Sequence, residues 1–185
     1  LLLAAGEGTR LRPLTLDWPK CLMPIKGRPL LEYWLFLLEQ LRIRNILVNT
    51  HYKKEIMEEF LNRERYSGLI NFTYEPKFLG TGGTLLANID FFRDKITLFI
   101  HADNWCHCDF EAFIDFHSNH RPANTIMTMM TFRTATPSSC GIVELDNAGI
   151  VQKFHEKVKK PPGNLANAAI YLLEPEVLDL LQSLP

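Results

Sequence analysis

The segment LAAGEGTRLRPLTLDWPK, residues 3–20, places glycines and cations together near the start of the chain. Gly6 and Gly8 let the backbone approach a ligand closely and tolerate a positive φ. Bare N–H groups in such a turn form an anion-binding concavity, and the Arg10 guanidinium adds a fork of donors for phosphate oxygens. Two prolines stiffen the chain that leads to Lys20. The segment therefore predicts a phosphate-binding loop.

The loop matches neither of the two commonest phosphate-loop patterns. A dinucleotide-binding fingerprint would have a third glycine at position 11, where Leu11 stands. A Walker A loop would end in Gly-Lys-Ser or Gly-Lys-Thr, and no such tripeptide follows Gly6 at the required spacing. A surface loop with solvated Arg10 and Lys20 is the competing interpretation. The run of glycines, cations and prolines favours a phosphate site of another kind.

Apolar runs alternate with helix-like segments in the part of the chain that follows this loop. The runs predict strands at residues 1–5, 46–50, 70–74, 96–101 and 125–132. Helical periodicity predicts helices at residues 30–41, 53–62, 82–89 and 110–117. This alternation indicates an α/β fold, with a Rossmann-like mixed, mostly parallel sheet flanked by helices on both faces.

The pattern changes after residue 134. Residues 141–145 and 150–155 flank the turn Asp146-Asn147-Ala148-Gly149 and predict a β-hairpin. A last strand at residues 168–173 and a short helix at residues 176–184 follow the loop KKPPGN. We expect a single domain over residues 1–185, because the chain has enough apolar residues for one sizeable core.

The predicted strands bring separate segments to one edge of the sheet. In open parallel sheets, ligands bind outside the carboxyl ends of the strands. Gly6, His51, Glu75 and Asp103 each come just after a predicted strand. Glycine, acid and histidine from four separate segments are therefore expected to meet there, which is a stronger indication of a site than any one motif.

Composition limits the classes of function. The net charge of −1 at pH 7 provides no general basic field for nucleic acid or a membrane surface, so an anion site must be local. No apolar run reaches the ~18–20 residues of a membrane span. The opening LLLAAG lacks the basic segment of a signal peptide. We therefore expect a cytoplasmic protein without nucleic-acid or membrane partners, and homo-oligomer formation stays open.

The four cysteines, Cys21, Cys106, Cys108 and Cys140, are too sparse for a disulfide framework and are expected to be reduced. Cys106-His107-Cys108 suggests a metal motif at first sight. A structural zinc site needs four ligands, and no second well-spaced pair accompanies these two cysteines. The sequence therefore does not favour a zinc site there.

Several motifs together resemble the sugar-phosphate nucleotidyltransferases, which make nucleotide sugars from a nucleoside triphosphate and a sugar 1-phosphate. GEGTRL at residues 6–11, with PLT and PK downstream, is similar to the family signature. The resemblance continues in order through EPKFLGTGG (75–83), HAD (101–103), CGIVELDNAGIVQKFHEK (140–157) and NAAIY (167–171). The match extends over essentially the whole chain.

The resemblance implies the nucleotide-diphospho-sugar transferase fold and direct attack of a sugar-phosphate oxygen on the α-phosphorus of the triphosphate. A phosphate oxyanion is already nucleophilic near pH 7, so catalysis would consist of positioning and charge stabilisation without a general base. Arg10 and Lys20 would be the catalytic residues that neutralise the triphosphate. Asp103 would hold Mg²⁺, a hard cation that prefers oxygen ligands.

The resemblance also implies two binding regions, with residues 1–133 mainly for the nucleotide and residues 134–185 mainly for the sugar phosphate. The implied nucleotide-binding residues are Leu3, Ala5, Gly6, Gly8, Thr9, Glu75, Gly80 and Thr81. The implied sugar-phosphate residues are Gly141, Glu156, Lys157 and Asn167. Glu156 can accept hydrogen bonds from sugar hydroxyls, and Lys157 can hold the phosphate as a point charge.

Glu75 favours GTP as the nucleotide. An ionised carboxylate only accepts hydrogen bonds, and guanine offers it two adjacent donors whereas uracil and thymine offer one. Mannose 1-phosphate is the expected sugar substrate. UTP, dTTP or CTP with another sugar 1-phosphate remain alternatives, as does a catalytically silent relative that binds a nucleotide sugar.

Four features depart from the family pattern. Ala102 and Ala169 stand where the family usually has glycine, and each added methyl narrows a place where backbone meets ligand. Cys140 replaces a common tyrosine. The family also has a second metal-binding acid in a later Asp-x-Gly-Thr segment, a role we do not give to Asp179. We therefore expect these residues to be part of a longer chain, truncated at both ends.

Overall fold

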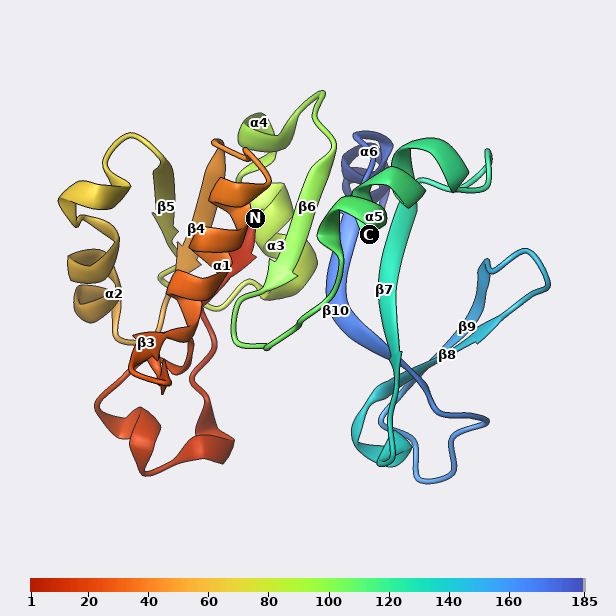
Figure 1. The fold of residues 1–185 in the computed structure, drawn as a ribbon, viewed down its shortest axis with the longest axis horizontal. Coiled ribbons are helices and arrows are strands. Elements are labelled where there is room, and N and C mark those ends of the chain that lie inside the picture. Colours follow the sequence, from red (N-terminus) through yellow and green to blue (C-terminus); the bar gives the residue numbers. More distant parts are fainter. Residues whose placement is uncertain (185) are drawn as a thin grey trace.

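The central sheet of the computed structural model, which describes residues 1–184, has eight strands (Figure 1). Their order is β5–β4–β1–β6–β10–β8–β9, and β7 also pairs with β10. The strands are β1 (Leu2–Leu3), β4 (Ile46–Thr50), β5 (Ile70–Tyr74), β6 (Thr97–His101), β7 (Met127–Arg133), β8 (Gly141–Leu145), β9 (Val151–Glu156) and β10 (Leu165–Leu173).

The first four strands in this order, β5, β4, β1 and β6, are parallel to one another. In the middle of this part, Leu2 is in register with Val48 on one side and Ile100 on the other. Every residue of β4 is buried. Strands covered on both faces have continuous apolar runs, which explains why this part of the sequence reads so clearly as strands.

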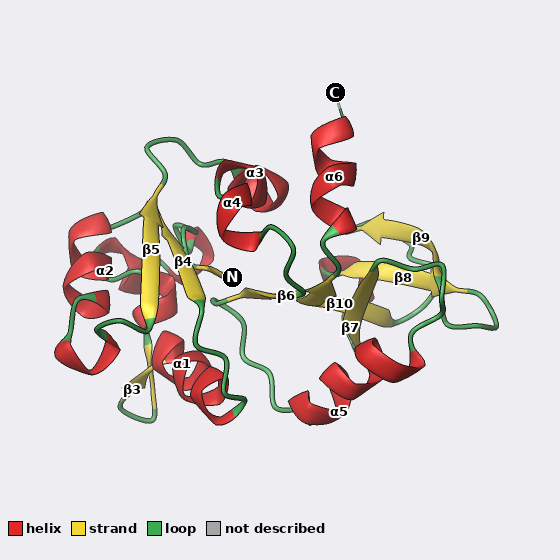
Figure 2. Ribbon diagram, turned by 90° about the horizontal axis from the view of Figure 1, so that it is seen from above, coloured by secondary structure: helices red, strands yellow, loops and turns green. Residues whose placement is uncertain are grey.

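Helices cover both faces of the sheet, as predicted (Figure 2). Helices α1 (Leu30–Gln40), α2 (Lys54–Leu61) and α5 (Phe110–Asp115) pack on one face, and α3 (Gly80–Ala87), α4 (Ile89–Phe92) and α6 (Glu176–Ser183) pack on the other. Successive strand residues point to opposite faces. Ile46 and Val48 accordingly join the first core cluster, whereas Leu47 joins the second.

The strand β10 connects the parallel part to the rest of the sheet. It runs antiparallel to β6, β7 and β8, and its register with β7 shifts between Asn167 and Tyr171. The hairpin β8–β9 extends away from the helices (Figure 1). Its turn is the predicted one: the Asp146 carboxylate accepts from the backbone N–H groups of Ala148 and Ile150, and Gly149 has a φ of 79°.

Most predicted elements are confirmed, with differences at their ends. The strands at 46–50 and 70–74 have the predicted bounds, whereas the last strand begins at Leu165 rather than at residue 168. The helix predicted at 110–117 ends at Asp115 and continues as a π-helical turn, Phe116–His120. Among the described residues, no helix combines the length and the apolar character that crossing a membrane requires.

The sequence patterns missed several short elements. The strands β2 (Pro24–Ile25) and β3 (Arg28–Pro29) form a small hairpin around Lys26 and Gly27, which both have a positive φ. Such short pairs carry no periodic signal. Three-residue 3₁₀ helices, which lack periodicity for the same reason, are Thr9–Leu11, Leu14–Leu16, Lys20–Leu22, Glu64–Tyr66 and Pro137–Ser139.

Candidate functional site

One large cleft brings the two parts of the predicted site together. Its volume is ≈ 960 Å³. Arg10, Lys20, Thr81 and Asp103 line it from the first part of the chain, and Gly141, Glu156, Lys157 and Asn167 line it from the second. The cleft lies where the parallel strands end, so the edge of the sheet is the one that the strand pattern predicted.

Two smaller concavities adjoin this cleft and share Asp103 with it. The first, of ≈ 200 Å³, is lined by Leu3, Ala5, Gly6, Gly80 and Thr81, with Asn49, Phe78 and His101. The second, of ≈ 400 Å³, is lined by Gly8, Thr9, Arg10, Leu11 and Lys20. Apart from Glu75 and His51, the residues predicted for the site therefore line one connected region, although their individual roles stay predictions. His51 Nδ1 instead lies 2.7 Å from the Glu75 carbonyl oxygen.

Gly8 determines how the first loop folds back on Lys20. Its φ of 63° lies in the left-handed region, and it begins the short helix Thr9–Leu11. A Cβ at this position would lie 2.9 Å from Lys20 Cβ and 3.0 Å from Thr15 Cγ2. The Gly8 carbonyl also accepts a hydrogen bond from Thr15 Oγ1 at 2.9 Å. Only glycine fits this position, and the resulting close packing brings Arg10 to the same concavity as Lys20.

Gly6 differs from Gly8. Its φ is not positive, and a Cβ built on it would meet no atom within 4 Å. The space beside the Gly6 backbone is therefore open to a ligand. Of the predicted site glycines, Gly8 and Gly80 adopt the left-handed conformation. Gly6 does not, and its lack of a side chain matters only because a ligand can approach its backbone closely.

Lys20 and Asp103 form the strongest electrostatic contact of the cleft. Lys20 Nζ lies 2.5 Å from Asp103 Oδ2, across 83 residues of sequence. The exposed fractions of the two side chains are 20% and 32%. Partial desolvation strengthens such a charge-assisted hydrogen bond and holds the ammonium group in place. A lysine and a carboxylate predicted to serve the same reaction are thus direct partners.

The surroundings of Glu75 contradict the role that the sequence predicted for this residue. Only 2% of the residue is exposed. Glu75 Oε1 accepts from Asn49 Nδ2 at 2.9 Å and from Thr84 Oγ1 at 2.5 Å. Glu75 Oε2 accepts from the Leu79 backbone N–H at 3.2 Å. The carboxylate is therefore occupied inside the protein, and the prediction that it reads the base was wrong. Its role is to hold the loop at residues 75–84 against β4.

Asn49 is a residue that sequence reasoning missed. It is buried on β4, where its Oδ1 accepts from the Ala4 backbone N–H at 2.7 Å and its Nδ2 donates to Glu75. One side chain thus links the ends of three neighbouring segments beneath the smaller pocket. A polar residue within the otherwise apolar run ILVNT was the available signal, because a buried amide needs partners.

Two rings also line the smaller pocket. Phe78 is 59% exposed, which leaves a face of its ring open to a ligand. His101 lies at the end of β6 and lines both this pocket and the large cleft. Burial holds the pKa of His101 below its ordinary value, although the Asp103 carboxylate opposes this shift. The imidazole is therefore neutral near pH 7 and can both donate and accept a hydrogen bond.

At the other end of the cleft, Gly141 allows the hairpin to close. It faces Glu156 across β8 and β9. A Cβ on Gly141 would lie 2.4 Å from Phe154 Cζ and 3.0 Å from Glu156 Oε2. The Phe154 ring therefore occupies the space that a Cβ at position 141 would need, and both Gly141 and Glu156 line the cleft.

Lys157 and Glu156 pair with each other in solvent. Lys157 Nζ lies 2.6 Å from Glu156 Oε1, and the exposed fractions of the side chains are 60% and 58%. Lys157 has a φ of 48°, and its backbone N–H donates to the Cys140 carbonyl. This turn directs Lys157 into the cleft. An exposed pair of this kind contributes little to stability and separates readily when a phosphate competes for the lysine.

Asn167 is tied to an irregularity in β10. Its Oδ1 accepts from the Ala169 backbone N–H at 2.8 Å, and its Nδ2 donates to the Tyr171 hydroxyl at 2.6 Å. Ala169 has a φ of 56°, a conformation that favours glycine. The two departures from the family pattern thus differ: Ala169 sits in a strained position, whereas Ala102 is buried without a positive φ.

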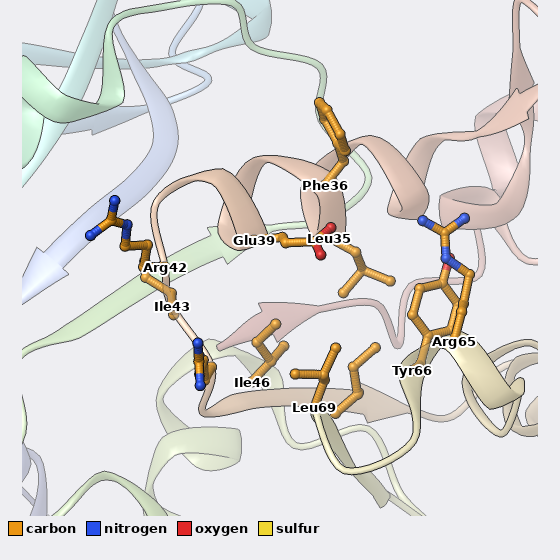
Figure 3. Close-up of a pocket in the computed structure, with 11 residues that line it drawn as sticks. Leu35, Phe36, Glu39, Arg42, Ile43, Ile46, Arg65, Tyr66 and Leu69 are labelled. Carbon is orange, nitrogen blue, oxygen red and sulfur yellow. The ribbon is translucent and has the colours of Figure 1, made fainter.

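A separate pocket of ≈ 380 Å³ lies at the opposite edge of the sheet, where β4 and β5 begin (Figure 3). Leu35, Ile46 and Leu69 point toward one another in its centre, and Arg42 and Arg65 lie at its two ends. Arg65 is paired with Glu32. None of the residues that the sequence singled out lines this pocket. The cleft at the carboxyl ends is therefore the candidate site.

The fold and the cleft define an α/β protein in which the glycine-rich first loop and the β8–β9 hairpin line one cleft. A sequence model of the nucleotidyl transferase family matches residues 1–184, and the chain belongs to that family. It is 35% identical over 191 residues to a mannose-1-phosphate guanyltransferase of Saccharomyces cerevisiae and 34% identical to one of Candida albicans. Both alignments cover 100% of this chain and 52% of the relative, so the chain spans about half the length of these relatives.

Solved structures of low identity share the fold. A Bacillus anthracis protein assigned as a glucose-1-phosphate thymidylyltransferase has a TM-score of 0.87 at 24% identity, over 100% of this chain and 74% of that protein. An apo UDP-glucose pyrophosphorylase has a TM-score of 0.80 at 18% identity, over 98% and 78% respectively. These neighbours confirm the predicted nucleotide-diphospho-sugar transferase fold.

Proposed function

We propose that this protein transfers the guanylyl group of GTP to mannose 1-phosphate, giving GDP-mannose and pyrophosphate. The observation that carries the proposal is the single cleft in which Arg10, Lys20 and Asp103 face Glu156, Lys157 and Asn167. Such a cleft can bind two phosphorylated substrates side by side. The names of the Saccharomyces and Candida relatives, both mannose-1-phosphate guanyltransferases, support the choice of GTP and mannose 1-phosphate.

The triphosphate end supplies charge stabilisation. The open space at Gly6 and the turn at Gly8 admit phosphate oxygens to backbone N–H groups. A sugar-phosphate oxygen forms a bond to the α-phosphorus while the bond from that phosphorus to the bridging oxygen of the β-phosphate breaks. Lys20 and Arg10 stabilise the negative charge that develops on the oxygens of the transferred and leaving phosphoryl groups. The reaction needs no general base.

The base is held mainly by backbone and by an aromatic face. Leu3, Gly6, Gly80 and Thr81 line the smaller pocket and would offer main-chain groups to a base, and the exposed Phe78 ring offers a stacking surface. Because the Glu75 carboxylate is occupied internally, the preference for GTP follows from the named relatives. UTP, dTTP or CTP remain competing nucleotides for the assay below.

Asp103 fits a role in binding Mg²⁺ together with substrate phosphates. It is a partly exposed carboxylate on the cleft, and Mg²⁺ sites often use one or two carboxylates with phosphate oxygens. Within residues 1–184, no group of three or more His, Cys, Asp or Glu side chains is arranged to hold a metal, so substrate oxygens would complete the set. When bound, Mg²⁺ would neutralise phosphate charge. Because Asp103 would then bind the metal, Lys20 would leave this carboxylate and pair with a phosphate oxygen.

The sugar phosphate is positioned by exposed groups. Lys157 can leave Glu156 to pair with the sugar phosphate, and Glu156 is then free to accept hydrogen bonds from sugar hydroxyls. The Asn167 amide, fixed by Ala169 and Tyr171, contributes a rigid polar wall. These contacts hold the attacking oxygen near the α-phosphorus, which is the main source of acceleration in such a displacement.

The test is a pyrophosphate-release assay on the full-length protein with Mg²⁺, in which GTP, UTP, dTTP and CTP are each combined with a panel of sugar 1-phosphates. Highest kcat/KM with GTP and mannose 1-phosphate is expected. Turnover with only another nucleotide and sugar 1-phosphate would show that the protein catalyses the same reaction on those substrates instead. Binding of a nucleotide sugar without turnover of any pair would favour the catalytically silent relative instead.

A further inference from the structure

Three sulfur atoms meet on the wall of the large cleft, and the proposed reaction uses none of them. The thiols of Cys106 and Cys108 both point at the Met130 thioether. The Cys106 Sγ–Met130 Sδ distance is 3.5 Å and the Cys108 Sγ–Met130 Sδ distance is 3.6 Å. The two cysteines lie in the loop after β6, and Met130 lies on β7. All three residues line the cleft.

The protein contains an instructive contrast to this cluster. Cys21 Sγ also lies 3.5 Å from a thioether, that of Met57, but both residues are buried in the core. A single thiol against a single thioether in an apolar core is ordinary packing. In the cleft two thiols share one thioether, Cys108 is exposed, and Cys106 is partly exposed. The cleft cluster therefore has a second thiol to bind a metal ion and is open to solvent, whereas the core pair has one thiol and is buried.

We propose that Cys106, Cys108 and Met130 form a three-sulfur binding site for a soft monovalent metal ion, with Cu(I) as its representative. Thiolate and thioether ligands select Cu(I) over harder cations. An ion about 2.3 Å from each of three surrounding sulfurs would place them about 4 Å apart. The two observed separations need to open by only a few tenths of an ångström.

The binding step is a simple exchange without redox change. The two thiols release their protons to solvent, two Cu–S thiolate bonds form, and the thioether adds a neutral third bond. Zn²⁺ fits less well, because structural zinc sites need four ligands and the described residues contain no group of three His, Cys, Asp or Glu side chains able to hold a metal.

The position of the site predicts inhibition. Cys106 and Cys108 share the cleft with Lys157 and Asn167, so a bound ion would restrict entry of the sugar phosphate. This consequence rests on the proposed function. The binding itself does not, and it can be measured without turnover.

The experiment is an anaerobic titration of the full-length protein with Cu(I) buffered by bicinchoninate. Tight binding of one equivalent at this cluster is expected. Cys106→Ser together with Cys108→Ser should weaken this binding at least 100-fold, whereas Cys140→Ser, another cysteine of the same cleft, should leave it unchanged. Equal effects of the two changes, or unaltered binding by the double variant, would overturn the site.

Met130→Leu tests the thioether directly. The swap conserves volume and should cost little stability. We expect Cu(I) affinity to fall about tenfold, because one of three ligands is lost while both thiolates remain. An affinity equal to that of the unchanged protein would refute the three-sulfur geometry. A transferase assay tests the predicted inhibition. One equivalent of Cu(I) should raise the KM of the unchanged protein for the sugar phosphate, whereas the KM of the double serine variant should not change. Retained binding without inhibition would refute only the predicted inhibition.

Discussion

The two ends of the cleft hold their lysines in different ways. At the proposed triphosphate end, Lys20 pairs with Asp103 across 83 residues, and both side chains are mostly buried. At the proposed sugar-phosphate end, Lys157 pairs with its sequence neighbour Glu156, and both side chains are mostly exposed. Lys20 is therefore positioned by a contact between distant parts of the chain, whereas Lys157 is positioned by the local turn in which it lies.

This difference indicates a division of labour. A charge that is already desolvated and fixed interacts strongly with charge that develops during a reaction. A hydrated and exposed charge interacts weakly and mainly contributes to binding. We therefore expect the triphosphate end to govern kcat and the sugar-phosphate end to govern KM.

The largest expected effect is that of Lys20→Ala. It should lower kcat by about 10³-fold, because the variant loses a preorganised cation at the reacting phosphate. Unfolding free energy should change by less than about 1 kcal/mol, because both side chains keep some contact with water and the desolvation of the two charges offsets much of their attraction. Steady-state kinetics and denaturant unfolding measure the two quantities.

Lys157→Ala is the matched change at the other end. It should raise the KM for the sugar 1-phosphate about tenfold with little change in kcat, and exposed Lys159→Ala should change neither. Equal losses of kcat from Lys20→Ala and Lys157→Ala would remove the proposed division between the two ends.

The next effect concerns the two loop glycines. Gly8→Ala should destabilise the protein by about 1–2 kcal/mol, because alanine is strained at a positive φ. It should also lower kcat about 100-fold through displacement of Lys20. Gly6→Ala is the control, since it meets no atom within 4 Å. It should fold normally and raise the KM for the triphosphate. Identical behaviour of the two variants would contradict the packing of Gly8 on Lys20.

Glu75→Gln should act on stability and leave the choice of nucleotide unchanged. The carboxylate accepts from three donors, and an amide cannot satisfy all of them, so a loss of about 1–3 kcal/mol is expected. Exposed Glu59→Gln serves as the control. The four-nucleotide assay and urea unfolding are the measurements. A switch in nucleotide preference at unchanged stability would restore Glu75 as a base-reading residue.

The smallest effect is expected in β10. Ala169→Gly relieves a positive φ that costs about 1–2 kcal/mol, while the freedom of glycine in the unfolded chain offsets about 0.5–1 kcal/mol. A net gain of up to about 1.5 kcal/mol should appear in thermal unfolding. Ala102→Gly, at a buried position without a positive φ, should instead destabilise. A loss from both changes would show that Ala169 is not strained.

The sequence predicted the parallel part of the fold well, because β4 is one continuous buried run and β5 alternates the partly buried Ile70 and Phe72 with polar residues. It predicted less where structure depends on partners. The beginning of β10 at Leu165 was missed because antiparallel neighbours extend the strand beyond its apolar run. Glu75 was misassigned because a loop acid in sequence can be a buried acid in space, and its donors Asn49 and Thr84 lie on other elements.

The sequence by itself determined the glycines, cations and acids available to the site and the edge of the sheet where they gather, because strand and helix periods are local properties. Only the tertiary structure decided that Lys20 pairs with Asp103, that Glu75 is internal, and that three sulfurs share the wall of the cleft. Those contacts join residues far apart in the chain. Their geometry depends on packing between elements, which no local pattern records.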